Sequence, residues 1–206
     1  MPQAVTLPGP AGPLEARVED PRADDVPAPV VGVVCHPHPL YGGTMQNKVV
    51  HTVARAMQEA GAPTVRFNFR GVGQSGGEYA QGVGEVDDAH AVIEWARARW
   101  RCPRLWLAGF SFGAAVALQA AQSARPSRLV TIAPPVGRII TQPVSHPGCP
   151  WLVVQGDRDE LVDCATVRQW AEAYAADAPQ LVVMRDAEHF FHGRLGELRA
   201  VVLEFL

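Results

Sequence analysis

Short apolar runs alternate along this chain with longer stretches in which apolar residues recur every three or four positions. The short runs predict strands that are buried on both faces, at residues 30–35, 64–69, 105–110, 129–133, 151–155 and 181–184. The longer stretches predict amphipathic helices at residues 46–60, 85–100, 112–123, 166–176 and 193–206. Because strands and helices alternate, we expect an α/β fold with a mostly parallel central sheet and helices on both faces.

The amino-terminal segment has a different pattern. Residues 8–12, Pro-Gly-Pro-Ala-Gly, favour a turn, and residues 13–20 alternate crudely between apolar and polar side chains. This pattern predicts a small antiparallel hairpin at the start of the chain. The sequence contains no internal repeat, low-complexity linker or change in composition, so we expect a single domain over residues 1–206.

Composition and charge narrow the range of partners. The chain has 18 basic and 21 acidic residues and a formal net charge of -3, so it lacks the positive excess that binds nucleic acid. No apolar run approaches the roughly 20 residues that cross a bilayer, and residues 1–5 do not resemble a signal peptide. We therefore expect a cytoplasmic protein without a nucleic-acid or membrane partner. Four widely spaced cysteines are expected to be free thiols: Cys35, Cys102, Cys149 and Cys164.

One motif indicates nucleophilic chemistry. Ser111 lies in Gly-Phe-Ser-Phe-Gly (residues 109–113), where a predicted strand meets a predicted helix. A sharp turn at this junction strains the serine backbone and brings chain segments so close that only glycine fits at the flanking positions. The turn exposes the hydroxyl at a helix N-terminus, where the backbone N–H of Phe112 and the helix dipole can stabilise an oxyanion. The motif predicts Ser111 as a nucleophile.

Two later loops contain groups that could activate this serine. The strand at residues 151–155 runs into a glycine turn with three candidate carboxylates: Asp157, Asp159 and Asp163. The strand at residues 181–184 leads to His189, and His192 is its rival as general base. A carboxylate and a histidine are the partners that a nucleophilic serine requires.

The Gly-x-Ser-x-Gly motif at a strand-to-helix junction resembles the nucleophile elbow of the α/β-hydrolase superfamily, in which an acid and then a histidine follow the serine. The superfamily pattern of a strand followed by Gly-x-x-Asp selects Asp159, and its histidine after the last strand selects His189. The resemblance therefore implies a catalytic triad of Ser111, Asp159 and His189. It also implies a second oxyanion donor in the loop after the first buried strand. That donor is the backbone N–H of His38, with Leu40 as the alternative, because the intervening proline has no N–H.

Two other patterns suggest a dinucleotide cofactor and a metal ion, but the neighbouring residues argue against both. Residues 71–76 formally match Gly-x-Gly-x-x-Gly, but the chain continues in a loop rather than a helix, and no acidic residue follows at the end of a next strand. His36 and His38 form a His-x-His pair, but Leu40 and Tyr41 stand where a metallo-hydrolase has further ligands. We expect neither a dinucleotide cofactor nor a metal. Residues 68–75 instead resemble a structural Arg-Gly-x-Gly-x-Ser turn of α/β hydrolases.

Five motif regions together resemble small bacterial serine hydrolases related to dienelactone hydrolases: residues 35–43, 68–75, 109–113, 156–162 and 187–194. Dienelactone hydrolase itself has a cysteine nucleophile, so lactone chemistry is not implied for Ser111. Only residues 134–150 separate two predicted strands where many superfamily members insert a cap, which predicts an open, lidless site. We expect a shallow groove lined by Tyr41, Phe110, Phe112, Pro134, Ile139 and Phe190, with Tyr41, Phe110 and Phe190 as candidates for substrate binding.

These features predict a serine hydrolase that cleaves small or exposed acyl esters through an acyl-enzyme intermediate, as carboxylesterases do. The alternatives on the same triad are a thioesterase, an amidase or peptidase, and an acyltransferase. A fourth alternative is a non-catalytic binding protein on a hydrolase scaffold.

Overall fold

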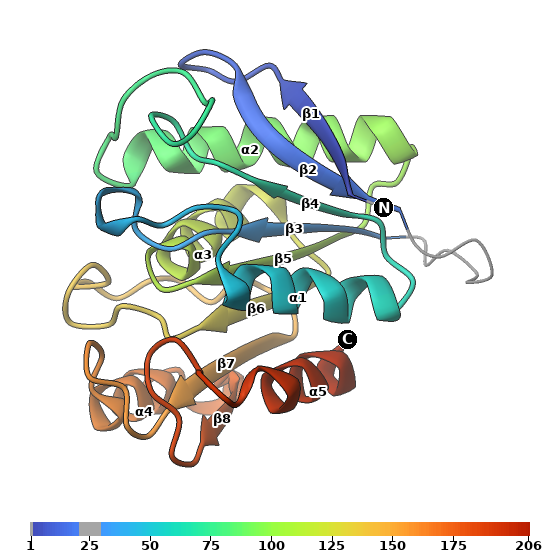
Figure 1. Cartoon of the computed structure of the whole chain (residues 1–206). Coiled ribbons are helices and arrows are strands. Elements are labelled where there is room, and N and C mark those ends of the chain that lie inside the picture. The colour runs from blue at the N-terminus through green and yellow to red at the C-terminus, as the bar shows by residue number, and fades with distance from the viewer. Residues whose placement is uncertain (1, 21–29) are drawn as a thin grey trace.

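The computed structural model describes residues 2–20 and 30–206 and contains one eight-stranded sheet (Figure 1). The order of its strands is β1 (Gln3–Leu7), β2 (Leu14–Glu19), β4 (Thr64–Phe67), β3 (Val31–Cys35), β5 (Leu105–Phe110), β6 (Arg128–Ile132), β7 (Trp151–Gly156) and β8 (Gln180–Met184). β1 and β2 form the expected antiparallel hairpin, and β3 to β8 are parallel to one another. We expected a single domain over residues 1–206 and no signal peptide at residues 1–5. Both ranges include residues that lie outside the described part of the chain.

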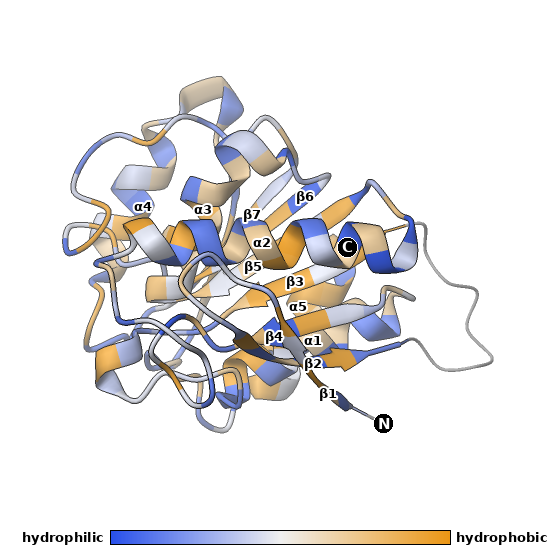
Figure 2. Cartoon of the chain, turned by 90° about the horizontal axis from the view of Figure 1, so that it is seen from above, coloured by the Kyte–Doolittle hydropathy of each residue, from blue (hydrophilic) through white to orange (hydrophobic). Residues whose placement is uncertain are grey.

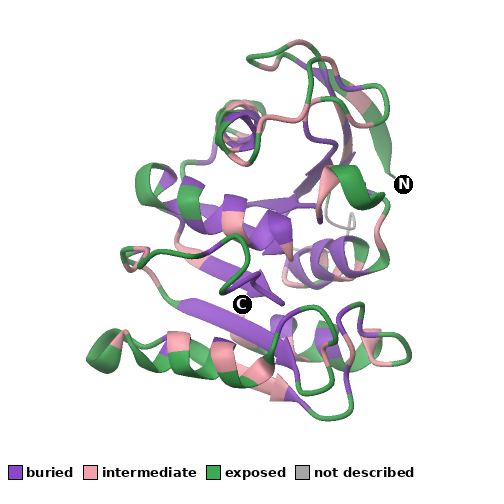
Figure 3. Ribbon diagram, turned by 90° about the vertical axis from the view of Figure 1, so that its left-hand side faces the viewer, coloured by how far each residue is buried: buried purple, intermediate pink, exposed green. Residues whose placement is uncertain are grey.

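Helices cover both faces of the sheet, as the pattern predicts. α1 (Lys48–Glu59) and α5 (Leu195–Phe205) pack on one face, and α2 (Val83–Trp100), α3 (Phe112–Ala124) and α4 (Cys164–Glu172) pack on the other. Each face has its own apolar core, because successive side chains of a strand point to opposite sides of the sheet. Strands β3 to β7 are therefore mostly apolar and buried, whereas the edge strands β1 and β8 are only partly buried and the helices are mixed (Figures 2 and 3).

Capping side chains determine where α4 and α2 begin, and the apolar periodicity alone does not reveal them. Asp163 accepts a hydrogen bond from the backbone N–H of Thr166 (2.8 Å), so α4 begins at Cys164 rather than at the predicted residue 166. Glu85 accepts hydrogen bonds from the N–H groups of Ala80 (2.8 Å) and Gly82 (2.7 Å), so α2 begins at Val83. The prediction that α4 continues to residue 176 is wrong, because the helix ends at Glu172 and a short 3-10 turn, η2 (Ala175–Asp177), follows.

The carboxyl ends of the six parallel strands meet at one edge of the sheet (Figure 1). The loops that follow β3, β5, β7 and β8 contain the predicted site residues, so the topology brings them to this edge. The connection at residues 134–150, between β6 and β7, contains no helix, and the expectation of a fold without a cap is confirmed. None of the helices in residues 2–20 and 30–206 combines the length and apolar content that crossing a bilayer requires.

Candidate active site

Ser111 occupies a strained turn between β5 and α3. Its φ of 54° and ψ of -119° lie in a region that residues other than glycine rarely adopt. The turn is fixed because Ser111 N–H donates to the Ile132 carbonyl (2.8 Å). A Cβ atom at Gly109 would overlap the carbonyl of Gly113, and one at Gly113 would overlap the carbonyls of Cys35 and His36. Both flanking glycines are therefore required by the close approach of backbone.

A chain of hydrogen bonds runs from Ser111 through His189 to Asp159. The hydroxyl oxygen of Ser111 lies 3.1 Å from His189 Nε2, and His189 Nδ1 lies 2.8 Å from Asp159 Oδ2. Because a carboxylate only accepts hydrogen bonds, the neutral ring has its proton on Nδ1, and Nε2 is free to accept the serine proton. The histidine and the aspartate are both buried. The structure thus brings the three predicted residues into the order that nucleophilic catalysis requires.

The rival acids and the rival histidine have other partners. Asp157 accepts a hydrogen bond from Asp186 N–H (2.7 Å), and Asp163 caps α4. His192 pairs with Glu188 on the surface. None of the three rivals is hydrogen-bonded to the Ser111–His189 pair among the contacts of the described residues, so the geometry selects Asp159 and His189.

Asp159 is held by three further hydrogen bonds. Its Oδ1 accepts from the N–H groups of Leu161 (2.9 Å) and Val162 (2.8 Å), and its Oδ2 accepts from the side-chain amide of Gln155 (2.9 Å). Burial by itself would raise the pKa of this carboxyl group. The hydrogen bond and charge of His189, together with the two N–H donors, outweigh burial and lower the pKa. Asp159 is therefore ionised at neutral pH and stabilises a positive charge on the His189 ring.

Sequence reasoning missed Gln155 and Glu160. Gln155 is fully buried in β7, and its amide also donates to the Val162 carbonyl (3.1 Å), so it links the strand to the loop that contains Asp159. Glu160 accepts a hydrogen bond from the backbone N–H of His189 (3.2 Å) and connects the acid loop to the histidine loop. A signal for Gln155 was present, because it is the one polar residue in the apolar run 151–155.

The loop after β3 lies directly against the serine turn, as the contacts around Gly113 indicate. Within it, the buried His36 ring accepts a hydrogen bond from Phe69 N–H at Nε2 (3.0 Å), and its Nδ1 lies 2.6 Å from the Pro37 carbonyl. Burial lowers the pKa of His36 to about 4, although the bond to Pro37 acts in the opposite direction. His36 is therefore a neutral bridge that fixes this loop to the end of β4.

His38 lies next to the serine turn, and its ring packs at a tilt against the ring of Phe112, with 4.9 Å between centroids. Its Nδ1 accepts a hydrogen bond from Leu40 N–H (3.2 Å), so the alternative oxyanion donor is already engaged. The proton of the neutral ring is therefore on Nε2, which lies 3.3 Å from the hydroxyl of Tyr79. Since His36 and His38 each use a ring nitrogen to accept a backbone N–H, the His-x-His pair is committed to structure rather than arranged around an ion.

The three candidates for substrate binding differ in exposure. Tyr41 is 86% exposed on the 3-10 turn η1 (Pro39–Tyr41), and Phe190 is 37% exposed beside His189. Phe110 is completely buried, so the expectation that its side chain lines the site is wrong. The strand alternation directs Phe110 into the core beneath α1 and α5, where its ring lies 5.1 Å from that of His189 and supports it.

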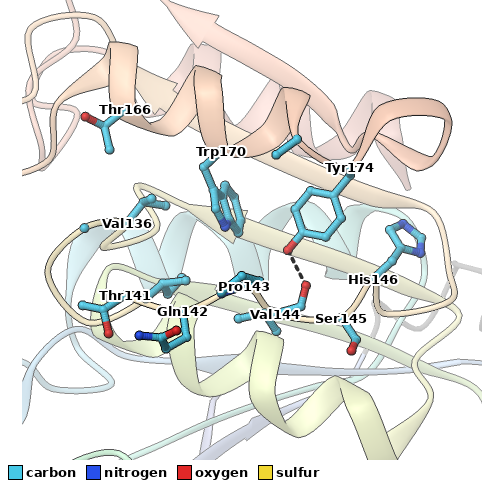
Figure 4. A pocket seen from close by; sticks show the side chains of 13 residues that line it. Val136, Thr141, Gln142, Pro143, Val144, Ser145, His146, Thr166, Trp170 and Tyr174 are labelled. Atoms are coloured by element: carbon cyan, nitrogen blue, oxygen red, sulfur yellow. Dashed lines mark hydrogen bonds between the residues drawn. The ribbon is translucent and has the colours of Figure 1, made fainter.

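Two hollows lie on either side of residues 139–145. One, of about 660 Å³, borders Phe112 and is enclosed by α2, α3 and this segment. The other, of about 670 Å³, lies between the segment and α4 (Figure 4), where Tyr174 donates a hydrogen bond to the Val144 carbonyl (2.8 Å). The lining of the first hollow includes Phe112 and Ile139, whereas the lining of the second contains none of the predicted site residues.

The glycine-rich residues 71–76 form a turn that is bonded to the amino-terminal hairpin. Ser75 donates its hydroxyl proton to the Asn68 carbonyl (2.7 Å) and accepts a hydrogen bond from Glu15 N–H (2.9 Å). Arg70, just before the turn, forms a two-pronged ion pair with the buried Asp88 of α2 (2.8 and 3.0 Å). The turn is thus a structural support beside the site and does not open a helix, as a dinucleotide-binding loop would.

Comparisons with known proteins agree with this geometry. The family model described as X-Pro dipeptidyl-peptidase (S15 family) matches residues 13–139. The structure of an α/β serine hydrolase without lid from Xanthomonas campestris is 48% identical, with a TM-score of 0.94 over 99% of this chain and 93% of that one. An α/β serine hydrolase homologue from Coxiella burnetii is 44% identical, with a TM-score of 0.93 over 99% of this chain and 97% of that one. An uncharacterized protein of Rickettsia prowazekii is 32% identical over 100% of this chain and 89% of its own length.

Proposed function

We propose that this chain, which belongs to the α/β serine hydrolases without a lid and, by its family match, to the S15 family, cleaves small or exposed acyl esters. The observation that supports the proposal best is the hydrogen-bonded sequence Ser111–His189–Asp159, with the serine on a strained turn at a helix N-terminus. A strained turn of this kind is retained when it presents a reactive group. We favour an ester over an amide because an alcohol oxygen leaves the acyl carbon more readily than an amine nitrogen does, so less depends on proton donation by His189.

In the proposed reaction, the Ser111 oxygen attacks the acyl carbon while its proton passes to His189 Nε2. The C–O bond to the alcohol then breaks, and His189 returns the proton to the departing oxygen. Water next attacks the acyl-enzyme and gives a proton to His189, and the Ser111 oxygen takes that proton as the carboxylic acid leaves. The ionised Asp159 favours both proton transfers to the ring, because it stabilises the imidazolium.

The proposed oxyanion donors are the backbone N–H groups of Phe112 and His38. Phe112 is the first residue of α3, so its N–H has no partner within the helix and adds to the positive end of the helix dipole. The choice of His38 is supported by the contact of its loop with Gly113 and by the bond that engages Leu40 N–H. One such donor typically contributes a factor of about 100 to 1,000 to kcat.

A substrate panel tests this function. Purified protein should hydrolyse p-nitrophenyl acetate and butyrate, and Ser111→Ala should lose this turnover while its thermal unfolding stays that of the wild type. Acyl-CoA thioesters, acyl amides and an acyl acceptor other than water form the other arms of the panel. Faster turnover in any of these arms would replace the ester assignment, and full activity of Ser111→Ala would refute the nucleophile.

The family match favours a second candidate, the cleavage of short peptides after proline. An Ala-Pro-p-nitroanilide substrate separates the two functions, because an esterase of this kind should leave the anilide nearly untouched. A higher kcat/KM on the anilide than on p-nitrophenyl butyrate would favour the peptidase.

A further inference from the structure

The ring of His38 has a hydrogen-bond partner at each nitrogen. Its Nδ1 accepts from Leu40 N–H (3.2 Å), and its Nε2 lies 3.3 Å from the hydroxyl oxygen of Tyr79. Because Nδ1 is an acceptor, the neutral ring donates its Nε2 proton to Tyr79. Burial lowers the pKa of His38, although the charge of Glu85 acts in the opposite direction, so the ring is uncharged at pH 7.

The backbone of His38 is fixed on its carbonyl side and free on its N–H side. The His38 carbonyl accepts hydrogen bonds from the N–H groups of Tyr41 (3.1 Å) and Gly43 (3.0 Å). Its own N–H donates to no acceptor among the hydrogen bonds of residues 2–20 and 30–206, and the same is true of Phe112 N–H. Both N–H groups are therefore available to an oxyanion, as the proposed reaction requires.

Three rings hold the two proposed donors close to each other. The His38 and Phe112 rings are 4.9 Å apart between centroids, and the Tyr79 ring lies 5.1 Å from His38 and 5.9 Å from Phe112. Such packing has no strong preference for one direction in the plane of a ring, whereas a hydrogen bond has. The bond to Tyr79 is therefore the contact that sets how the His38 ring is turned.

Tyr79 belongs to a segment that is anchored outside the loop after β3. It lies between β4 and α2, and Glu85 of α2 accepts hydrogen bonds from the N–H groups of Ala80 (2.8 Å) and Gly82 (2.7 Å) directly after it. The Glu85 side chain is completely buried. The Tyr79 hydroxyl can therefore hold the His38 ring from a fixed point on α2.

We infer, on the basis of the proposed esterase function, that Tyr79 is a positioning residue. Its hydroxyl holds the His38 ring and thereby directs the His38 backbone N–H toward the oxyanion. Because the carbonyl oxygen of an ester gains its negative charge only during attack, this effect acts on the transition state and not on the bound ester.

A cycle of two substitutions tests the inference. Tyr79→Phe removes the hydroxyl that accepts from His38 Nε2. His38→Asn keeps an acceptor for Leu40 N–H, because asparagine can bond the N–H two residues further on, but its side chain is too short to reach Tyr79. Tyr174→Phe is the matched control, since the Tyr174 hydroxyl donates to the Val144 carbonyl (2.8 Å) at the hollow beside α4.

Each variant and the double variant are assayed for kcat and KM on p-nitrophenyl butyrate and for inhibition by propyl trifluoromethyl ketone. The Ser111 oxygen adds to the carbon of this ketone, the serine proton passes to His189, and the ketone oxygen becomes an oxyanion. The Ki of the ketone therefore reports on the oxyanion donors without any leaving group. Thermal unfolding checks that each variant is folded.

Tyr79→Phe should lower kcat about tenfold and raise the ketone Ki about tenfold, which is part of the factor of about 100 or more that one donor contributes. KM should change less than about twofold, because acylation and deacylation form the oxyanion at the same place. In the His38→Asn background, where the bond is already absent, Tyr79→Phe should change kcat less than about twofold. Tyr174→Phe should keep the wild-type kcat and Ki.

Two kinds of failure are distinguishable. Wild-type protein that neither cleaves the ester nor binds the ketone would refute the esterase function and this inference with it. In active protein, three results would overturn the inference alone. These are an unchanged kcat and Ki in Tyr79→Phe, a rise in KM at constant kcat, and a full tenfold effect of Tyr79→Phe in the His38→Asn background.

Discussion

Acidification should weaken this fold through His36, and the structure gives the size of the effect. The His36 ring is completely buried between the Phe69 N–H and the Pro37 carbonyl. Burial lowers its pKa from 6.5 to about 4 in the folded protein. In the unfolded chain the ring is in water and titrates near its ordinary value of about 6.5.

The unfolded chain therefore binds a proton at a pH where the folded protein does not. The contribution of His36 to stability is complete above the unfolded pKa, and it is lost as the pH falls through 6.5 toward about 4. Linkage between these two pKa values gives a loss of about 2 kcal/mol in the free energy of unfolding between pH 7 and pH 5, and about 3 kcal/mol by pH 4. At pH 5 most carboxyl groups are still ionised, but burial also lowers the pKa of His38 and of His51, so a variant at His36 is needed to separate its contribution.

Urea unfolding of wild-type protein and His36→Gln at pH 7 and pH 5 measures this contribution. Glutamine can accept from Phe69 N–H and donate to Pro37, but it does not titrate. The stability gap between the two proteins should therefore shrink by about 2 kcal/mol at pH 5. His192→Gln, at an exposed histidine outside the loop after β3, is the control for the loss of a histidine side chain. If His36→Gln lost as much stability as the wild type on acidification, the assignment of the effect to this buried ring would be refuted.

Three further substitutions follow from the site geometry. Asp159→Asn replaces the acceptor of His189 Nδ1–H with an amide and should lower kcat on p-nitrophenyl butyrate about 10,000-fold; a loss below about tenfold would contradict its role. Gln155→Leu removes one donor to Asp159, so kcat should fall about tenfold at constant KM, and it also removes the donor to the Val162 carbonyl, so thermal stability should fall; unchanged kcat would count against positioning by Gln155. Gly109→Ala sets a Cβ atom against the Gly113 carbonyl and should lower the free energy of unfolding by at least about 3 kcal/mol in urea, whereas wild-type stability would contradict the steric account.

The fold and the sharp turn at Ser111 could be predicted from local pattern, whereas Asp159 and His189 were selected from their rivals by the resemblance to the α/β-hydrolase superfamily. Strand and helix periodicities fix the parallel sheet, and a sheet of this kind collects the loops after its strands at one edge. The glycines around Ser111 identify the sharp turn through sterics alone. The order of a serine, an aspartate after a glycine turn and a histidine after the last strand then follows along the chain.

The remaining features depend on side-chain contacts that the hydrophobic pattern does not show. His36 finds its partner at Phe69, and Leu40 N–H is engaged by the side chain of His38 only because of the way the loop folds. The wrong prediction that Phe110 lines the site has a different cause. The Phe110 side chain shares a strand face with Trp106 and Ala108, and helices cover this face as they cover the other, so Phe110 is buried.

The most direct test of the central claim is covalent labelling of the nucleophile. Wild-type protein treated with a fluorophosphonate probe and analysed by peptide mass spectrometry should contain one adduct, on Ser111, and should lose ester hydrolysis in proportion to labelling. His189→Ala should label far more slowly, because the serine then has no base. An adduct on another residue, or folded wild-type protein that remains unlabelled while it hydrolyses esters, would contradict the account.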